Sequence, residues 1–359
     1  METINEALTF DDVLLLPKYS NILPIDTNIS LNLTKNLVLR VPFLTSAMDT
    51  VTESKMAIAI AKEGGMGIIH RNLNITKQSK EVRKVKKQKL IVGAAIGTNI
   101  EDLERVKSLI SNGVDLIVID TAHGHSEKVL KTLSKVKKII KNLPVCVGNI
   151  ATGEAAKKLF NAGADIIKVG IGPGSICTTR MVAGIGVPQI SAIMDVKKAL
   201  NNKKVKIISD GGIKFSGDIA KALAAGADAI MMGSIFAGTE ESPGKKFKIK
   251  GKIYKQYRGM GSIGAMSAGS ANRYFQKKFK DKSKYVPEGV EGRVEFKGKV
   301  SKIIYQLQGG LKSSMGYIGA KNLKEIYKKA KFVKITKAGF YESMVHSVEM
   351  TQKTINYKL

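Results

Sequence analysis

The chain has little of what marks secreted, disulfide-stapled or membrane-spanning proteins. Its 359 residues include two cysteines, too few for a disulfide framework. It contains no apolar run of about 18 residues, the length that a membrane-spanning helix needs. No leading segment has the pattern of a signal peptide. These absences predict a reduced, cytoplasmic protein with no membrane partner.

Acidic residues are scarce beside basic ones, with 30 Asp and Glu against 59 Lys and Arg and a net charge of +29. Such an excess can mark a nucleic-acid-binding protein. The lysines, however, are spread over helix-like stretches, aromatic residues make up only 6% of the chain, and no cysteine and histidine spacing matches a zinc finger. We therefore do not expect nucleic acid to be the main partner. Anionic small substrates suit the charge equally well.

The chain also lacks a glycine-rich dinucleotide fingerprint between a strand and a helix, which disfavours an open doubly wound sheet. What it has is an alternation of short apolar runs with segments of helical period. The runs are nearly continuous in Val, Ile and Ala, as expected of buried parallel strands. We predict strands at 41–47, 65–70, 90–97, 116–120, 144–148, 166–170, 206–211 and 229–234. Helices are predicted at 54–63, 101–111, 126–141, 153–160, 188–201 and 216–225.

A weak internal repeat supports this alternation. Gly-Val-Asp at 113–115 and Gly-Ala-Asp at 163–165 and 226–228 each follow a predicted helix and precede a strand, where glycine is a natural helix terminator. Eight strand and helix units in about 200 residues predict an α/β fold, a closed (β/α)8 TIM barrel. The active site of such a barrel is built from the segments after the carboxyl ends of the strands.

The most informative of these segments is the glycine-rich loop at 170–180, GIGPGSICTTR, which carries Cys177. Glycines allow backbone N–H groups to approach a phosphate closely. A thiol in a polar loop near Arg180 is a candidate nucleophile. A plain strand-to-helix turn with an incidental thiol is the alternative. The other cysteine, Cys146, lies within a predicted strand and is expected to be an inert core thiol.

Two further glycine turns follow the last two strands, Asp210-Gly211-Gly212 and Gly233-Ser234. Barrels often hold phosphate with backbone N–H groups at these positions, although ordinary turn chemistry also favours such residues. His123 and His125 lack nearby carboxylate or cysteine partners in the sequence and are a weak zinc signal.

Past the eighth strand, residues 245–302 are rich in lysine and glycine and have no strong periodicity. A long insertion of this kind is either functional or disordered. Its aromatic and acidic residues, including the stretch YRGMGS at 257–262 and the pair Arg273-Tyr274, favour a mobile functional flap with a finger-like part. A helix predicted at 314–331 would complete the eighth unit.

Taken in order, the cysteine loop, the two phosphate turns, the YRGMGS stretch and the Arg-Tyr pair resemble the inosine-5'-monophosphate (IMP) dehydrogenase family over nearly the whole chain. The resemblance implies NAD-dependent oxidation of IMP to xanthosine monophosphate (XMP), a step toward guanine nucleotides. It also implies a homotetramer activated by potassium (K+). Without the resemblance, the sequence would indicate only a barrel enzyme for an anionic ligand.

The resemblance assigns catalytic roles to five residues. Cys177 would attack C2 of the purine, a hydride would leave to the nicotinamide, and a covalent thioimidate would remain. Arg273, assisted by Tyr274, would activate the water that hydrolyses this adduct, with Thr179 and Glu288 as an auxiliary proton relay. Arginine is an unusual base, because its guanidinium ordinarily keeps its proton. A plain role for Arg273 as a phosphate or carboxylate partner therefore stays open.

The ligand-binding residues implied by the resemblance fall into three groups. The IMP site would comprise Ser46, Met48, Ser175, Asp210, Gly211, Gly212, Gly233, Ser234, Tyr257, Gly259, Met260, Gly261 and Glu288. The NAD site would comprise Asp120, Thr121, Asn149, Gly170, Ile171 and Gly172. Potassium would lie on carbonyls of Gly172, Gly174 and Cys177, joined by Glu342, Ser343 and Met344 of a neighbouring subunit, so that each site is shared between subunits.

The chain departs from the family pattern in three respects. Most members insert a regulatory CBS pair between the second helix and the third strand, whereas this chain continues directly through residues 85–90. We therefore expect one catalytic domain over residues 1–359 and no nucleotide regulation through that module. Asn272 replaces the usual aspartate before Arg273, which bears on flap charge and closure. Met344 replaces a common histidine or glycine.

Two alternatives differ in function. Guanosine monophosphate (GMP) reductase is a sister barrel that shares the cysteine loop and phosphate turns but reduces GMP to IMP with NADPH. Because its reaction needs no activated water to hydrolyse the adduct, Arg273-Tyr274 argues against it. A non-enzymatic barrel that binds nucleotides or RNA is the second alternative, and it predicts salt-sensitive binding to long nucleic acid.

Overall fold

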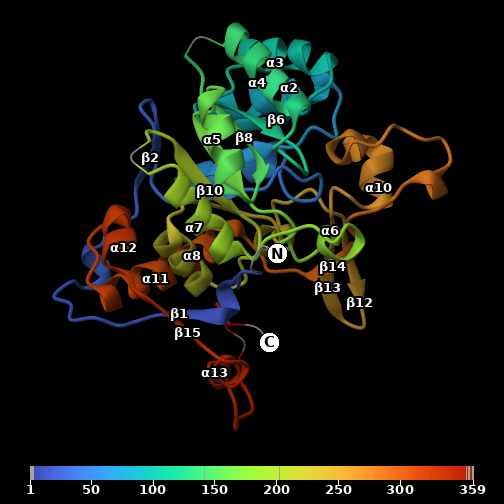
Figure 1. Cartoon of the computed structure of the whole chain (residues 1–359). Helices are drawn as coiled ribbons and strands as arrows, with labels where there is room; N and C mark the ends of the chain where they lie inside the picture. Colours follow the sequence, from blue (N-terminus) through green and yellow to red (C-terminus); the bar gives the residue numbers. More distant parts are fainter. Residues whose placement is uncertain (1–3, 141, 202, 353, 355, 358–359) are drawn as a thin grey trace.

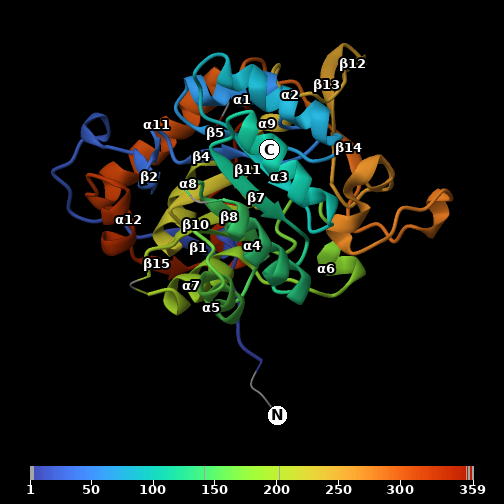
Figure 2. The same ribbon diagram turned by 90° about the horizontal axis from the view of Figure 1, so that it is seen from above.

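The computed structural model describes residues 4–140, 142–201, 203–352, 354, 356 and 357, and its centre is a closed barrel of eight parallel strands (Figures 1 and 2). The strands pair in chain order, and the last one, β11, pairs back with β4. The (β/α)8 TIM barrel and all eight predicted strands are therefore confirmed. The strands are β4 (Phe43–Thr45), β5 (Met66–Ile69), β6 (Gly93–Ile96), β7 (Leu116–Asp120), β8 (Val145–Ile150), β9 (Ile166–Val169), β10 (Lys206–Asp210) and β11 (Ala229–Met232).

Helices surround the strands because successive strand residues point alternately into the barrel and out toward the helices. On β7, Leu116 and Val118 belong to the interior cluster, the buried side chains inside the barrel, whereas Ile117 and Ile119 pack outward. Other members of the interior cluster are Leu44, Ile68, Ile166 and Ile208. The helices that follow strands are α1 (Ser54–Lys62), α2 (Ile75–Lys86), α3 (Glu101–Ser111), α4 (Glu127–Ile139), α5 (Gly153–Asn161), α7 (Gln189–Ala199) and α8 (Ser216–Ala225). The predicted helices are all present among them, except that residue 141, the expected end of α4, lies outside the described residues.

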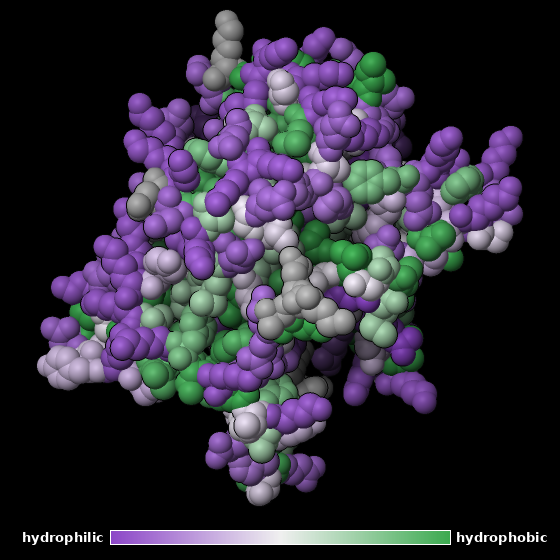
Figure 3. Space-filling model, in the orientation of Figure 1, coloured by the Kyte–Doolittle hydropathy of each residue, from purple (hydrophilic) through white to green (hydrophobic). Residues whose placement is uncertain are grey.

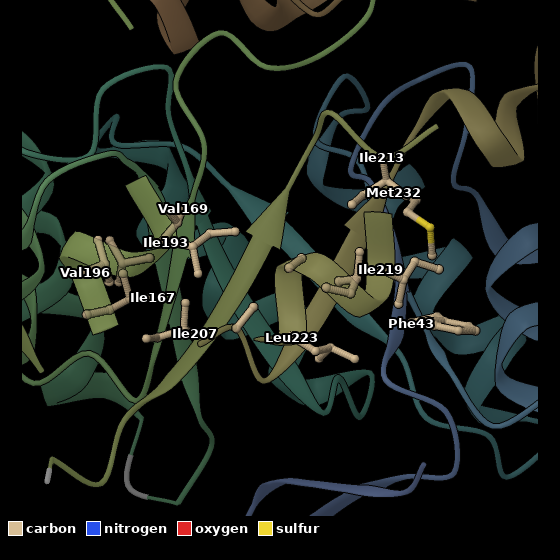
Figure 4. Packing of buried hydrophobic residues seen from close by; sticks show 14 of the residues in the cluster. Phe43, Ile167, Val169, Ile193, Val196, Ile207, Ile213, Ile219, Leu223 and Met232 are labelled. Atoms are coloured by element: carbon tan, nitrogen blue, oxygen red, sulfur yellow. The ribbon is translucent and has the colours of Figure 1, made fainter. Parts of the chain in front are cut away.

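Figure 4 shows this outer core at close range. Ile193 and Val196, one turn apart on α7, lie beside Ile167 and Val169 of β9 and Ile207 of β10. All five side chains are buried, and burial of each aliphatic side chain contributes about 1.5–3 kcal/mol. This packing fixes the strand ends from which the site is built.

The eighth helix differs from the prediction of one helix at 314–331. The structure has α11 (Val300–Ile318) and α12 (Leu323–Lys329). Gly319, with a φ of +70°, ends α11, and the side chain of Asn322 caps α12 by accepting from the backbone of Glu325. Helix α11 contacts both α1 and α8, so it fills the eighth helix position with an earlier start than expected.

The insertion has ordered structure. Strands β12 (Lys246–Ile249), β13 (Lys252–Arg258) and β14 (Glu291–Glu295) form an antiparallel sheet that projects from the barrel (Figure 1). Between β13 and β14 lie the short turns α10 (Ile263–Ala265), η3 (Met266–Ser270), η4 (Ala271–Tyr274) and η5 (Lys282–Lys284). The segment between β13 and β14 is called the flap below. The insertion ends before residue 300, where α11 begins.

Segments outside the barrel units close its amino end and flank. The hairpin of β2 (Leu31–Thr34) and β3 (Leu37–Leu39) places leucines against the interior cluster. Strand β1 (Val13–Leu15) pairs with β15 (Phe332–Lys334), which precedes α13 (Lys337–Glu342).

Hydrophilic residues cover most of the face seen in Figure 3. None of the helices in the described part of the chain is both long and apolar enough to cross a membrane. The remaining short helices are η1 (Phe10–Asp12), η2 (Pro24–Asp26), α6 (Thr179–Val182) and α9 (Ser234–Ala237).

Candidate active site

A cavity opens at the carboxyl end of the barrel, where the predicted site residues meet. It draws its lining from the ends of β4, β7, β8, β9, β10 and β11 and from the flap. The predicted residues that line it are Ser46, Met48, Asp120, Asn149, Gly170, Ile171, Gly172, Gly174, Ser175, Cys177, Thr179, Asp210, Gly211, Gly212, Gly233, Ser234, Tyr257, Gly259, Met260, Arg273, Tyr274 and Glu288. Segments that are distant in sequence therefore share one concave site.

Cys177 lies at one end of a short hydrogen-bonded line. Its Sγ donates to Thr179 Oγ1 at 3.2 Å, and Thr179 Oγ1 donates to Glu288 Oε2 at 2.8 Å. The backbone holds this line in place, because Thr178 N donates to the Glu288 carbonyl at 3.0 Å and Val290 N to the Ile176 carbonyl at 3.1 Å. A proton leaving the thiol thus has a hydrogen-bonded route to a carboxylate.

Glycines shape the phosphate turns. Gly211 and Gly212 have φ values of +92° and +83°, in the left-handed region that favours glycine. A Cβ at Gly170 would lie 2.1 Å from the carbonyl oxygen of Asp210, so only glycine fits where the two loops touch. These turns line the cavity, and glycine turns of this kind suit an anion.

A hydroxyl and a thioether meet at the next turn. A Cβ at Gly233 would lie 3.1 Å from Met48 Sδ and 3.2 Å from Tyr257 Oη. Burial raises the pKa of Tyr257 to about 12, although a hydrogen bond with the Ser175 side chain opposes this shift. Tyr257 therefore keeps its proton near neutral pH and can donate a hydrogen bond to a ligand.

Lys168 is a site residue that the sequence interpretation missed. It projects from the middle of β9 with 2% of its side chain exposed, and its Nζ donates to Asp120 Oδ1 at 3.0 Å and to Asp210 Oδ2 at 2.6 Å. It also contacts Asn149 Oδ1. A buried charge needs such partners. One ammonium thus joins the residues predicted for the cofactor to the aspartate predicted for the substrate ribose.

The flap reaches into the cavity beside this lysine. Arg273 forms an ion pair with Asp120 through Nη1, and its carbonyl accepts from Ala122 N at 3.0 Å. A Cβ at Gly261 would lie 2.7 Å from Tyr274 Cζ, so glycine makes room for the tyrosine ring, and burial raises the pKa of Tyr274. The flap arginine therefore occupies the carboxylate that the sequence predicts for a cofactor ribose.

Several predicted residues do not line the cavity. Thr121 lies just behind it and donates through Oγ1 to the Gly148 carbonyl at 2.9 Å, while Gly261 backs Tyr274. Glu342 ends α13, and Ser343 and Met344 follow it; α13 packs on η1 of the same chain. Their assignment to a neighbouring subunit's potassium site stays a prediction.

The two remaining sequence signals have clear environments. Cys146 is 0% exposed, and burial raises the pKa of its thiol to about 12, so its prediction as a core thiol is confirmed. The rings of His123 and His125 lie 6.2 Å apart. Within the described ranges, no cluster of three His, Cys, Asp or Glu side chains could hold a metal ion.

Comparison with known proteins places these features in a family context. The family model described as IMP dehydrogenase / GMP reductase domain matches residues 7–346. A protein of Cryptosporidium parvum named inosine-5'-monophosphate dehydrogenase is 48% identical over 99% of this chain and 99% of its own. A protein of the same name from Aquifex aeolicus is 43% identical over 99% of this chain and 98% of its own. Another, from Borreliella burgdorferi, is 48% identical over 96% of this chain and 97% of its own. The Aquifex alignment spans 483 positions, so it includes segments with no counterpart among the 359 residues of this chain.

Proposed function

We propose, from the premise that the chain belongs to the IMP dehydrogenase / GMP reductase family, that it oxidises IMP to XMP with NAD as the hydride acceptor. The family prediction and the prediction of an oxidoreductase are confirmed by relatives that match nearly the whole chain. The observation that carries the proposal is the line from Cys177 through Thr179 to Glu288, which opens into a cavity edged by glycine turns.

The first half of the proposed reaction uses the thiol. Cys177 Sγ adds to C2 of the purine, the electrons of the C2–N3 double bond move to N3 until the hydride leaves, and the thiol proton passes along Thr179 toward Glu288. The hydride then leaves C2 with both electrons of the C–H bond, and a thioimidate links purine and protein. Asp210 accepts from the ribose hydroxyls, while the turns at 211–212 and 233–234 hold the phosphate through backbone N–H groups.

The second half uses water and the flap. Water adds to C2, the C–S bond breaks, and the sulfur regains a proton as XMP leaves. Arg273 accepts the proton of the water, with Tyr274 beside it. A guanidinium can act in this way only where its surroundings oppose its charge. The ion pair of Arg273 with Asp120 leaves a purely structural pairing as the competing role, and substitution of Arg273 separates the two.

The residues at the cofactor end suit NAD. Bound NAD supplies the acceptor for the hydride at its nicotinamide. Asp120 can accept from the cofactor ribose and disfavours a 2'-phosphate, which would bring a second negative charge to the same place. Asn149 and the loop of Gly170, Ile171 and Gly172 line the adjoining space, with Thr121 behind them. Asn149 donates to the Gly170 carbonyl at 2.8 Å, which fixes its amide orientation.

Potassium and subunit assembly complete the proposal. The cysteine loop is a turn in which Cys177 N donates to the Gly174 carbonyl at 3.1 Å, and its neutral carbonyl oxygens suit a hard cation. The carbonyls of residues 342–344 would come from the next subunit of a cytoplasmic homotetramer. The chain acts as one catalytic domain without a CBS pair, since residues 87–92 alone connect α2 to β6.

The test is direct. Purified protein is mixed with IMP and NAD, with and without potassium, and NADH is followed by its absorbance. Steady NADH formation that potassium stimulates supports the proposal. Oxidation of NADPH in the presence of GMP, with no NADH from IMP, would identify a GMP reductase instead. The presence of Arg273 and Tyr274 in the cavity favours the dehydrogenase, because only its reaction needs an activated water.

A further inference from the structure

The loop after β5 holds the flap at two points. Arg71 Nη1 donates to Asn272 Oδ1 at 2.5 Å, next to the flap residue Arg273. Asn72 Nδ2 donates to the carbonyl of Ala265, the last residue of α10 in the flap, at 3.2 Å. The first contact joins a charged donor to a neutral acceptor, a stronger bond than one between two neutral groups.

Arg71 is itself buried against the barrel. Only 8% of the residue is exposed, and a Cβ at Gly97 would lie 2.8 Å from its Nη1 and 2.7 Å from Asp102 Oδ2. The missing Cβ lets the guanidinium and this carboxylate lie against the end of β6. Asp102 is fixed in turn by the backbone of Asn99, whose N donates to Asp102 Oδ2 at 3.0 Å. Arg71 Nη1 therefore donates to Asn272 of the flap from a buried position at the end of β6.

The charges around this contact are finely balanced. Burial lowers the pKa of Arg71 to about 10; the charge of Asp102 opposes this shift, and the charge of Arg273 adds to it. The charge of Arg105 also lowers this pKa, so the closed flap adds the guanidinium of Arg273 to one that is already near Arg71. Asn272, where an aspartate would add a negative charge, offers Arg71 only a neutral carbonyl oxygen.

We propose that Arg71 is a positioning residue that holds the flap closed through Asn272, and that the neutral Asn272 keeps this anchor weak enough for Arg273 to leave Asp120. This inference rests on the proposed function for its kinetic consequence. Arg273 and the cofactor ribose need the same Asp120 carboxylate, so closure of the flap and binding of NAD compete. The strength of the anchor then sets how the enzyme divides its time between hydride transfer and hydrolysis.

The first experiment measures flap opening without any catalysis. An arginine-specific protease cleaves after Arg273 only when the flap is open, because in the closed flap the Arg273 carbonyl accepts a hydrogen bond from Ala122 N. The cleavage rate then follows the open population. Loss of a hydrogen bond to a charged group should raise this population about tenfold or more. We expect faster cleavage in Arg71→Met and Asn272→Ala and slower cleavage in Asn272→Asp, identified by peptide mass.

Arg105→Met is the matched control. Arg105 is similarly buried and pairs with the same Asp102, and it bonds Gln78 and the Leu73 carbonyl without touching the flap. Its loss should lower the unfolding temperature and leave cleavage after Arg273 within about twofold of the native rate. Because Asn272 is only half-buried, Asn272→Ala keeps the test usable where Arg71→Met fails to fold.

The second experiment compares the KM for NAD, the NADH burst and kcat of the same variants. Since apparent affinity scales with the competent fraction, Arg71→Met and Asn272→Ala should lower the KM for NAD severalfold, keep the first NADH burst, and lower kcat by about tenfold. Asn272→Asp should raise the KM. Native cleavage rates in both weakened variants, or equal loss of burst and turnover, would overturn the anchor. Absence of NADH from the native protein would instead overturn the proposed reaction and leave the protease result to decide the anchor.

Discussion

Cys146 and Cys177 belong to successive units of the barrel, yet their surroundings differ completely. Cys146 is the second residue of β8 and is fully buried with Ile166 and Ile208 in the interior cluster. Cys177 lies in the loop beyond β9, where a threonine hydroxyl is 3.2 Å from its Sγ. Interior strand positions supply packing, whereas loops at the carboxyl ends supply polar groups and open space. Position along the strand, and not residue type, separates a core thiol from a candidate nucleophile.

The largest expected effect comes from Cys177, the cysteine in the loop beyond β9. Cys177→Ala removes the only group that can form the proposed C–S bond, so the rate of NADH formation should fall by at least about a thousandfold. Rapid-mixing absorbance with IMP and NAD measures it. An NADH burst from this variant would end the nucleophile assignment and, with it, the contrast between the two cysteines.

The flap arginine should affect a later step. Arg273→Ala should form one equivalent of NADH and then turn over about a hundredfold more slowly or worse, because a general base contributes at least that much. Burst amplitude and steady-state rate from a single progress curve separate the two phases. Unchanged steady-state turnover would reduce Arg273 to a structural partner of Asp120.

Two lysines on adjacent strands sharpen the comparison of the two barrel ends. Lys168 is 2% exposed and bridges two aspartates, while Lys206 is 31% exposed and pairs with Asp228. Lys168→Met leaves two buried carboxylates without their cationic partner and should cost about 3 kcal/mol of unfolding free energy. Lys206→Met should cost less than about 1 kcal/mol. Urea unfolding of both variants compares them, and equal losses would refute a special role for Lys168.

The smallest effect belongs to the interior cysteine. Cys146→Ala leaves a small cavity and should cost roughly 1 kcal/mol of stability, with kcat unchanged. Iodoacetamide at neutral pH should modify Cys177 and spare Cys146, whose thiol is buried and protonated. Peptide mapping after alkylation provides the check. Alkylation of Cys146 in the folded protein would show that the interior is more open than its packing indicates.

Much of the barrel was predictable because its signals are local. Each strand is a short apolar run, and β7 and β10 were placed within one residue of their ends. The start of α11 was missed because its first turns lie next to a lysine- and glycine-rich insertion that hides their period. The pairing of β1 with β15 joins the two ends of the chain, and no local pattern can reveal such a contact.

The site was predictable where residue type and loop position coincide, as at Cys177 and the turns at 210–212. Lys168 was missed although a charge inside an apolar strand was a usable signal, since burial without a partner would be costly. Arg71 offered no such signal. Its role depends on Asn272, 201 positions away, and only the folded chain brings the two together.

The most direct test of the central claim is the intact mass of Arg273→Ala after incubation with IMP and NAD, followed by mapping of the modified peptide. We expect a purine nucleotide adduct on the peptide that carries Cys177, formed in step with the NADH burst and absent without NAD. A full burst with unmodified protein would contradict a covalent route through Cys177.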